Sequence, residues 1–461
     1  MSSATNDARA ASAPAPPAAI ERPSRRAAFR YWLRLGFVNF GGPAAQIAIM
    51  HEDLVERRRW IGHDRFMHAL SYCNLLPGPE AMQLATYIGW LLHGTLGGVV
   101  AGTLFVLPGA LAMLLLSVLW ALYGDLDWVT GLFYGFGPAV IAIVGAAVLR
   151  IGRKSLRRPA LWTIAAGAFV SIFFFDAPFP AIIAAAAALG LAAGRWRPAW
   201  VRPGGLDGAG TEPAAAPGES PRRSGIGHAL RVFLVHAVLW GGPIVALGLA
   251  RGWDDLFSRL AVFFSIAAVV TFGGAYAVLS YVAQAAVHRY AWLSAREMTV
   301  GLGLDEPTPG PLILIVQWVG FLAGYHHPPA GWTPLAAGLV GTAVTLWVTF
   351  VPCFLWIFAG APSVERLRGN RVLDAALATI SAAVVGVILN LALWLALRVV
   401  FAEVSVVAAG PMTLNVPDLR TIDALALAAA AVGFVGIIRY HWSMIAVVLG
   451  GGAIGLATKL L

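Results

Sequence analysis

The chain contains few charged residues. Asp, Glu, Lys and Arg account for 12% of its 461 residues, whereas 59% are hydrophobic. Soluble domains carry about twice that charged fraction, so the composition excludes an ordinary soluble protein. Several apolar runs, among them residues 97–123, 132–149 and 372–397, reach the roughly 18 residues that a helix needs to cross a bilayer. Because the short alternating segments of a membrane β-barrel are missing, the sequence predicts an all-α polytopic membrane protein.

The sequence also lacks the motifs of catalysis, metal binding and nucleotide hydrolysis. The two cysteines, Cys73 and Cys353, both stand in apolar segments, so neither a disulfide framework nor a zinc site is expected. No G-x-x-x-x-G-K-[ST] motif is present, which argues against a primary pump. No nucleophile–base or metal constellation supports a membrane enzyme that acts on lipid-linked substrates. We therefore expect no enzyme activity, no cofactor, no metal and no nucleic-acid partner.

Basic residues outnumber acidic ones, and the formal net charge is +9. Basic loops of membrane proteins stay in the cytoplasm, so we interpret this charge first as a topology signal; a positive field that attracts anions is compatible with it. Residues 1–28 are rich in Ala, Pro and Ser without an apolar core, which predicts a disordered cytoplasmic tail rather than a signal peptide. The Pro- and Gly-rich stretch 198–225 indicates a linker between two halves.

The two halves are copies of one unit. Three landmarks recur 232 residues apart: NFGG at Asn39 and TFGG at Thr271, Trp60 and Trp292, and PGP at Pro77 and at Pro309. We assign residues 1–28 to the tail, 29–197 to a first repeat, 198–227 to the linker, 228–250 to a connecting transmembrane helix and 251–461 to a second repeat. A duplicated membrane unit is typical of secondary transporters.

Each copy holds six apolar segments, and one more separates the copies. They are residues 29–50, 66–93, 95–123, 129–150, 160–175 and 178–194, then 228–250, then 260–288, 297–324, 333–360, 372–399, 421–438 and 441–458. Six spans return the chain to its starting side, and the seventh places the second copy on the opposite side. We therefore predict about thirteen segments in two halves of inverted topology.

Loop charges agree with this inversion. The acidic loop 124–128 is expected outside, whereas its counterpart 361–371 holds three arginines and is expected inside. The stretch 51–65 does not fit this charge pattern. It holds four arginines, which favour the cytoplasm, but it would be cytoplasmic only if segments 29–50 and 66–93 re-enter the membrane. The sequence leaves spanning and re-entrant arrangements open.

The FGG and PGP motifs interrupt apolar segments. Proline lacks a backbone donor and ends a helix, and the half-helix that follows presents free amides at the positive end of its dipole, which favours an anion. Glycine lets the backbone come close to a ligand, although small residues also simply let helices pack. We predict that the breaks of both halves converge on one anion site near the membrane midplane. Its candidate residues are Asn39, Phe40, Gly41, Gly42, Pro77, Gly78, Pro79, Thr271, Phe272, Gly273, Gly274, Pro309, Gly310 and Pro311.

Polar side chains near the breaks are candidates for lining this site or for coupling transport to an ion. They are Glu80, Gln83, Asp305, Glu306 and Gln317. A carboxylate is awkward beside an anion, so it either couples transport to protons or caps the N-terminus of a half-helix. Trp60 and Trp292 are expected at the membrane interface.

Residues 36–94, with FVNFGGPAAQ and LLPGPE, and residues 268–324, with FGGAYA and EPTPGPLIL, resemble the paired signature regions of the chromate ion transporter family in its long, two-domain form. The resemblance implies a secondary active transporter of the bacterial inner membrane that exports chromate and so confers resistance. Sulfate or another tetrahedral oxyanion is the alternative substrate. Proton coupling and the oligomeric state, a homodimer included, stay open. Pro43 in the first copy faces Ala275 in the second, so the two FGG loops need not match.

Overall fold

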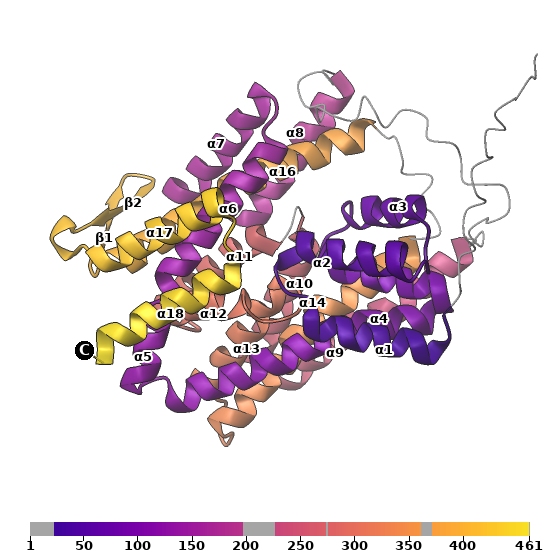
Figure 1. Cartoon of the computed structure of the whole chain (residues 1–461), viewed down its shortest axis with the longest axis horizontal. Coiled ribbons are helices and arrows are strands. Elements are labelled where there is room, and N and C mark those ends of the chain that lie inside the picture. The colour runs from indigo at the N-terminus through magenta and orange to yellow at the C-terminus, as the bar shows by residue number, and fades with distance from the viewer. Residues whose placement is uncertain (1–22, 197–225, 273–274, 361–370, 461) are drawn as a thin grey trace, which may run out of the picture.

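A computed structural model describes residues 23–196, 226–272, 275–360 and 371–460 of the chain (Figure 1). The fold is mostly helical, as predicted. Most of the predicted linker 198–227 lies outside the described residues. Helix α1 begins at Arg25, with Ser24 as its N-cap, so ordered helix extends into the range that was assigned to the tail.

The first repeat contains eight helices and one π-helical turn among the described residues. They are α1 (Arg25–Val38), α2 (Gly42–His51), the π turn η1 (Glu52–Arg57), α3 (His63–Cys73), α4 (Glu80–Tyr123), α5 (Asp127–Tyr134), α6 (Phe136–Ser155), α7 (Pro159–Phe175) and α8 (Phe179–Trp196). Helix α9 (Ile226–Arg251) then connects the repeats.

The second repeat follows the same order. Its elements are α10 (Leu256–Val270), α11 (Ala275–Gln284), the π turn η3 (Ala285–Arg289), α12 (Ala295–Asp305), η4 (Leu312–Leu314), α13 (Ile315–His326), α14 (Pro334–Gly360), α16 (Arg371–Val400), β1 (Val404–Ala409), β2 (Met412–Pro417), η6 (Leu419–Thr421), α17 (Ala424–Tyr440) and α18 (Met444–Leu460).

Strands β1 and β2 are an exception to the predicted all-α fold. They form an antiparallel hairpin in which Val404 pairs with Pro417 and Ala409 with Met412. The hairpin joins α16 to α17, whereas residues 156–158 alone join the equivalent helices α6 and α7. The stretch VSVVAAGPMTLNVP has the sequence pattern of a β-hairpin, since β-branched residues flank a Gly-Pro turn.

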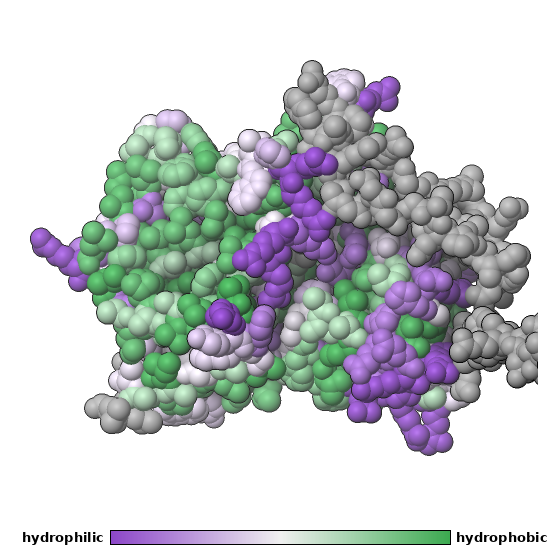
Figure 2. All heavy atoms as spheres, turned by 45° about the horizontal axis from the view of Figure 1, so that its top comes forward, coloured by the Kyte–Doolittle hydropathy of each residue, from purple (hydrophilic) through white to green (hydrophobic). Residues whose placement is uncertain are grey.

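The surface of the molecule is that of a membrane protein. Six helical stretches among the described residues are long and apolar enough to span a bilayer: Glu80–Tyr123, Asp127–Ser155, Phe179–Trp196, Leu230–Arg251, Pro334–Gly360 and Val372–Val400. On α4 an exposed stripe of leucines runs along one face, at Leu111, Leu115, Leu119 and Leu122. Figure 2 shows wide hydrophobic areas that a hydrophilic strip interrupts. Exposed apolar surface of this extent needs lipid to cover it.

The prediction of about thirteen apolar segments is not confirmed. Beside the six long stretches, five apolar helices have 17 residues or fewer: Pro159–Phe175, Leu256–Val270, Leu312–His326, Ala424–Tyr440 and Met444–Thr458. The physical reason lies partly in the breaks. Segments 29–50, 66–93, 260–288 and 297–324 are each interrupted, and apart from the 44-residue α4 the α-helices within them have 10 to 15 residues, which at 1.5 Å per residue extend only about 15–22 Å.

The backbone repeats the same unusual features in both halves. Arg59 and Ala291, which are 232 residues apart, both have positive φ, at 52° and 49°. The amide of Trp60 donates to Leu54 and that of Trp292 to Ala286, each over 2.8 Å. Both tryptophans are buried, with 7% and 3% exposure, so they pack inside the protein against the turn after each π segment instead of projecting from its surface as an interface anchor would.

Helix α4 is folded back on itself. His93 and Gly94 leave helical geometry, and Gly94 has φ 67° and ψ −161°. The two arms then meet at glycines, because a Cβ on Gly89 would lie 2.5 Å from the carbonyl oxygen of Gly97. Helices α13 and α14 form the same hairpin in the second repeat, where a Cβ on Gly320 would lie 2.7 Å from the oxygen of Gly341.

The helices form two bundles, and each bundle contains equivalent helices from both repeats (Figure 1). In one bundle, α6 of the first repeat packs against α17 and α18 of the second, and α16 of the second repeat packs against α7 and α8 of the first. Each repeat thus packs this helix on the last two helices of the other repeat. In the other, α1 packs against α4 and α10 against α14, and α4 contacts α14. Helices α11 and α12 bridge the bundles through contacts with α16 and α6.

The exchanged packing depends on glycines that leave no room for a side chain. A Cβ on Gly135, at the α5–α6 junction, would lie 1.7 Å from the oxygen of Gly451 in α18. We expect Gly135→Leu to push α18 away and cost roughly 1–3 kcal/mol or more, lowering the melting temperature and the fraction of monodisperse protein in detergent. Gly167→Leu is the control, because a Cβ there meets nothing within 4 Å. Equal stability of both variants would contradict the close approach.

Candidate functional site

The four predicted breaks are all present as interruptions between helices. Helix α1 ends at Val38 with Asn39 as C-cap, and α10 ends at Val270 with Thr271 as C-cap. The PGP loops lie between α3 and α4 and between α12 and η4. Their central glycines, Gly78 and Gly310, have φ of 118° and 108°, values that residues with a side chain rarely adopt.

Each FGG break is hydrogen-bonded to the PGP break of the other repeat. The Gly78 amide donates to the Thr271 carbonyl over 2.8 Å, and the Gly310 amide donates to the Asn39 carbonyl over 3.4 Å. The two bonds join equivalent positions in reciprocal fashion. They also occupy the two glycine amides, so in this conformation neither is free to bind a ligand.

The long helices supply a small residue where each PGP loop packs. Gly109 in α4 and Cys353 in α14 follow the internal prolines of those helices. A Cβ on Gly109 would lie 1.9 Å from the carbonyl oxygen of Pro309, and a Cβ on Gly78 would lie 3.1 Å from Sγ of Cys353. Each loop is therefore seated on the long helix of the opposite repeat.

Four buried amide side chains donate to backbone carbonyls around the breaks. Gln46 Nε2 lies 2.8 Å from the oxygen of Asn39 and 2.6 Å from that of Gly310, so it ties both sides of one junction. The other bonds run from Gln83 to Pro77 (2.7 Å), from Gln317 to Ala110 (2.8 Å) and from Asn39 to Phe105 (3.3 Å).

These bonds fix which end of each amide remains open. A carbonyl oxygen only accepts hydrogen bonds, so the NH₂ group of each amide must face it. The amide oxygens are then buried without a hydrogen-bond partner among the described residues; they belong to Asn39, Gln46, Gln83 and Gln317. The side chains at the breaks therefore present unused acceptors.

Two adjacent carboxylates end α12. Asp305 and Glu306 are 3% and 6% exposed, and the Tyr276 hydroxyl donates to Glu306 Oε1 over 2.9 Å. Within the described residues, neither oxygen of Asp305 and only one of Glu306 has a hydrogen-bond partner. A buried charge without partners is costly, so a proton or a nearby cation must offset it. The sequence did not single out Tyr276.

Glu80 lies in a different environment, at the start of α4. It is partly exposed and is the first residue of the helix, after Pro79. The first described backbone bond of this turn runs from Gln83 to Pro79. The amides of Glu80, Ala81 and Met82 have no acceptor among the described residues, as expected of the first turn of a helix.

Helix α6 carries positive charge toward both groups of acids. Lys154 acts electrostatically on Glu80, and Arg150 on Glu306. Arg150 and Lys154 are four residues apart and so share one face of the helix. Since α6 belongs to one bundle and the breaks to the other, these attractions act across the boundary between bundles.

The structure describes every predicted break residue except Gly273 and Gly274, which lie outside the described part. The buried ones are Asn39, Gly42, Gly78, Pro79, Thr271, Gly310 and Pro311. The partly exposed ones are Phe40, Gly41, Pro77, Phe272 and Pro309. Among the polar candidates, Gln83, Asp305, Glu306 and Gln317 are buried. No group of three or more His, Cys, Asp or Glu in the described ranges is arranged to hold a metal ion.

Comparison with known proteins identifies the family. The profile of the chromate transporter family matches residues 26–191 and 258–456, one stretch in each repeat. The chain belongs to this family. It is similar to the chromate transport protein of Cupriavidus metallidurans, with 28% identity over 413 residues, 89% of this chain and 92% of the relative. It is also similar to the chromate transport protein of Pseudomonas aeruginosa, with 32% identity over 369 residues, 78% of each chain.

Shorter relatives match about a quarter of the chain. An uncharacterised transporter of Bacillus subtilis is 33% identical over 125 residues, which is 27% of this chain and 64% of the relative. No solved structure matches the chain. Family membership and the long apolar helices together make this a multi-pass membrane protein of a transporter family.

A substitution of Gln46 tests how much the contact between the first FGG break and the second PGP break depends on a side-chain donor. Gln46→Leu removes the donor from two buried carbonyls, of which that of Gly310 has no other partner among the described residues. We expect a loss of about 1–3 kcal/mol in stability, seen as a lower melting temperature in detergent. Gln284→Leu is the control, since its partly exposed side chain makes a single hydrogen bond within the described part of the chain, to Asp176. Equal melting temperatures would show that the junction does not need this donor.

Proposed function

We propose that this chain is a secondary transporter that exports chromate from the cytoplasm across the bacterial inner membrane, with sulfate or another tetrahedral oxyanion as the alternative substrate. The relatives that are named chromate transport protein, at 28% and 32% identity over most of the chain, support chromate. The single observation that carries the mechanism is the reciprocal pair of hydrogen bonds between broken helices of opposite repeats.

The mechanism requires two states that expose one site to opposite sides. We infer that the repeats have inverted topology and that the N-terminus is cytoplasmic. Each bundle contains equivalent helices from both repeats, an arrangement in which one bundle can rock against the other around a fixed site. The two junctions are unequal, at 2.8 Å and 3.4 Å. Transport would then loosen the shorter junction and tighten the longer one.

The oxyanion would bind at the breaks, in contact with the first turn of α4. The unused amides of Glu80, Ala81 and Met82 lie at the positive end of the helix dipole and can donate to its oxygens. The unpartnered amide oxygens of Gln46 and Gln83 would accept from a hydroxyl of a protonated oxyanion. A site with both donors and acceptors suits a tetrahedral acid that loses and gains protons.

The paired carboxylates of α12 are the proposed site of proton coupling. Asp305 and Glu306 are buried with unpartnered oxygens, and Tyr276 orients Glu306. Arg150 of the other bundle acts on Glu306, so a rocking motion would change the charge that this carboxylate faces. A carboxylate whose cationic neighbour withdraws takes up a proton instead.

Chromate uptake into inside-out membrane vesicles tests the function and the breaks together. The wild type should accumulate chromate, less so in excess sulfate if sulfate shares the site. Val at Gly78 would bring its Cβ to 2.8 Å from Gln83 Nε2, at a φ that only glycine tolerates. We expect Gly78→Val, Gly310→Val and Pro79→Ala each to lower the rate per folded molecule by about tenfold or more.

The control is a Gly→Val substitution at another glycine with positive φ, one that lies away from the breaks. Gly331 lies in the loop between α13 and α14, has φ 82°, and has nothing within 4 Å of an added Cβ. Gly331→Val should therefore transport at the wild-type rate once normalised to monodisperse protein. Near-normal rates per folded molecule in all three break variants would remove the PGP loops from the transport site.

Carboxylate variants test the coupling. Glu306→Gln keeps an oxygen that accepts from the Tyr276 hydroxyl but removes the group that exchanges a proton. Asp305→Asn likewise removes the proton-exchanging carboxyl group of Asp305. We expect at least one of them, or Glu80→Gln, to transport at a rate that no longer changes when the pH gradient is collapsed. Asp254→Asn, at a surface acid whose ion-pair partner among the described residues is Arg259, should keep the wild-type response. A wild-type pH response in all three variants would leave these acids without a coupling role.

A further inference from the structure

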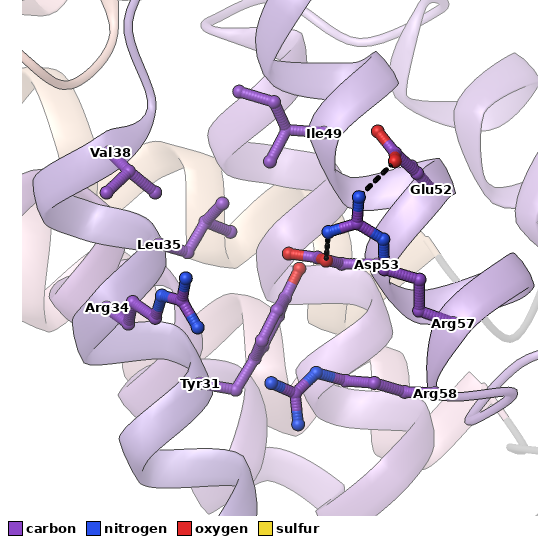
Figure 3. Close-up of a pocket in the computed structure, with 9 residues that line it drawn as sticks. All are labelled: Tyr31, Arg34, Leu35, Val38, Ile49, Glu52, Asp53, Arg57 and Arg58. Carbon is purple, nitrogen blue, oxygen red and sulfur yellow. Dashed lines mark hydrogen bonds and ion pairs between the residues drawn. The ribbon is translucent and has the colours of Figure 1, made fainter.

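A cavity of about 500 Å³ lies beside the first repeat's FGG break (Figure 3). Its lining residues come from α1, α2, η1 and the residue after η1: Tyr31, Arg34, Leu35, Val38, Ile49, Glu52, Asp53, Arg57 and Arg58. Val38 directly precedes Asn39, the residue that is hydrogen-bonded to the opposite PGP loop. The cavity therefore adjoins the proposed transport site without containing any of its predicted residues.

The charges in this cavity do not cancel. Arg57 lies 2.5 Å from Glu52 and 3.5 Å from Asp53, so one arginine engages both acids. Among the described residues, Arg34 and Arg58 have no ion-pair partner. The Arg58 guanidinium lies 5.1 Å from the ring centres of Tyr31 and Trp60, so two aromatic faces position it beside the cavity. The guanidinium groups of Arg34 and Arg58 can therefore bind an anionic group.

A buried hydroxyl completes the set of donors. Tyr31 is 3% exposed, and its hydroxyl has no hydrogen-bond partner among the described residues. In Figure 3 its side chain lies between those of Arg34 and Arg58. An unpartnered buried hydroxyl is costly, and an acceptor oxygen of a ligand would remove that cost. Two guanidinium groups and a hydroxyl are the donors that bind tetrahedral oxyanions.

The second repeat provides an internal comparison. A cavity of about 640 Å³ there is lined at the equivalent positions by Ile266, Tyr281, Gln284, Ala285 and Arg289. The arginine equivalent to Arg57 is kept, whereas Arg34 is replaced by Ile266. Tyr31 and Arg58 correspond to Phe263 and Tyr290. The fold therefore produces a cavity in both repeats, but the positions of Arg34, Arg58 and Tyr31 carry two arginines and a buried hydroxyl only in the first.

We propose that the Arg34–Arg58 cavity is a second binding site for a tetrahedral oxyanion group, apart from the helix breaks. Two sources share this chemistry: the free oxyanion and the phosphate of an anionic lipid headgroup. The part that the site plays in transport, gathering the anion before it reaches Asn39, rests on the proposed function. Its capacity to bind does not, because binding is measurable without transport.

Calorimetric titration of chromate and of sulfate into the purified full-length protein in neutral detergent tests the site. We expect Arg34→Gln, Arg58→Gln and Tyr31→Phe each to weaken one binding event about tenfold, since each removes a donor to a charged group. Arg30→Gln is the matched control: it removes the same charge one turn earlier on α1, at an exposed residue that does not line the cavity. Tyr31→Phe installs the residue of the second repeat and should fold normally.

A second arm distinguishes the two sources. The same variants are placed in nanodiscs with and without phosphatidylglycerol, and their melting temperatures are compared. If the cavity holds a headgroup phosphate, the wild type and Arg30→Gln gain stability from this lipid while the cavity variants do not, and free-anion titrations stay unchanged. If neither titration nor lipid response differs from that of Arg30→Gln, the proposal is overturned.

Transport kinetics separate this site from the breaks. In inside-out vesicles, cavity variants that bind the free anion more weakly should raise KM and keep kcat, whereas break variants lose kcat. Loss of kcat in the cavity variants would contradict a gathering site and assign these residues to the transport step. If the wild type moves no chromate, the proposed function fails, but the titrations still decide whether the cavity binds.

Discussion

A buried helix that is interrupted must find partners for the peptide groups that the interruption frees. In this protein the interruptions satisfy one another. The amide of each PGP glycine is bonded to the carbonyl at the opposite FGG break, and Gln46 adds a donor to one of the two junctions. Neither repeat can complete its own breaks, so the two halves depend on each other for a stable core.

This mutual dependence explains the packing around the centre. Each PGP loop packs closely on the long helix of the other repeat. Small residues that follow the internal prolines, Gly109 in α4 and Cys353 in α14, leave room for this contact. The outer helices follow the same logic, since α6 and α16 each pack on the last two helices of the opposite repeat. The reciprocal bonds differ in length, 2.8 Å against 3.4 Å, so a scaffold that is nearly symmetric still holds two unequal junctions.

Local chemistry made the breaks and the repeat predictable. Proline and glycine act on their own neighbours, so the ends of α1, α3, α10 and α12 follow from the sequence alone. Which break meets which is a tertiary property, and nothing in either motif indicates that Gly78 bonds to Thr271. The burial of Trp60 and Trp292 was missed for the same reason: a tryptophan beside a basic loop is typical of an interface, and only the turn after each π segment shows why it lies in the core. The cavity at Arg34 needs three segments to come together, and no local pattern marks it.

The duplicated scaffold carries different charges in its two halves. The first repeat has free arginines and a tyrosine hydroxyl around one cavity, where the second has Ile266, Tyr290 and Phe263. The second repeat has the buried carboxylates Asp305 and Glu306, where the first has Cys73 and Asn74. The arginine-lined cavity and the pair of buried carboxylates therefore stand on opposite copies of one unit. Positions that are equivalent in the shared backbone thus differ in charge, so the two halves are not interchangeable even though their breaks and turns match.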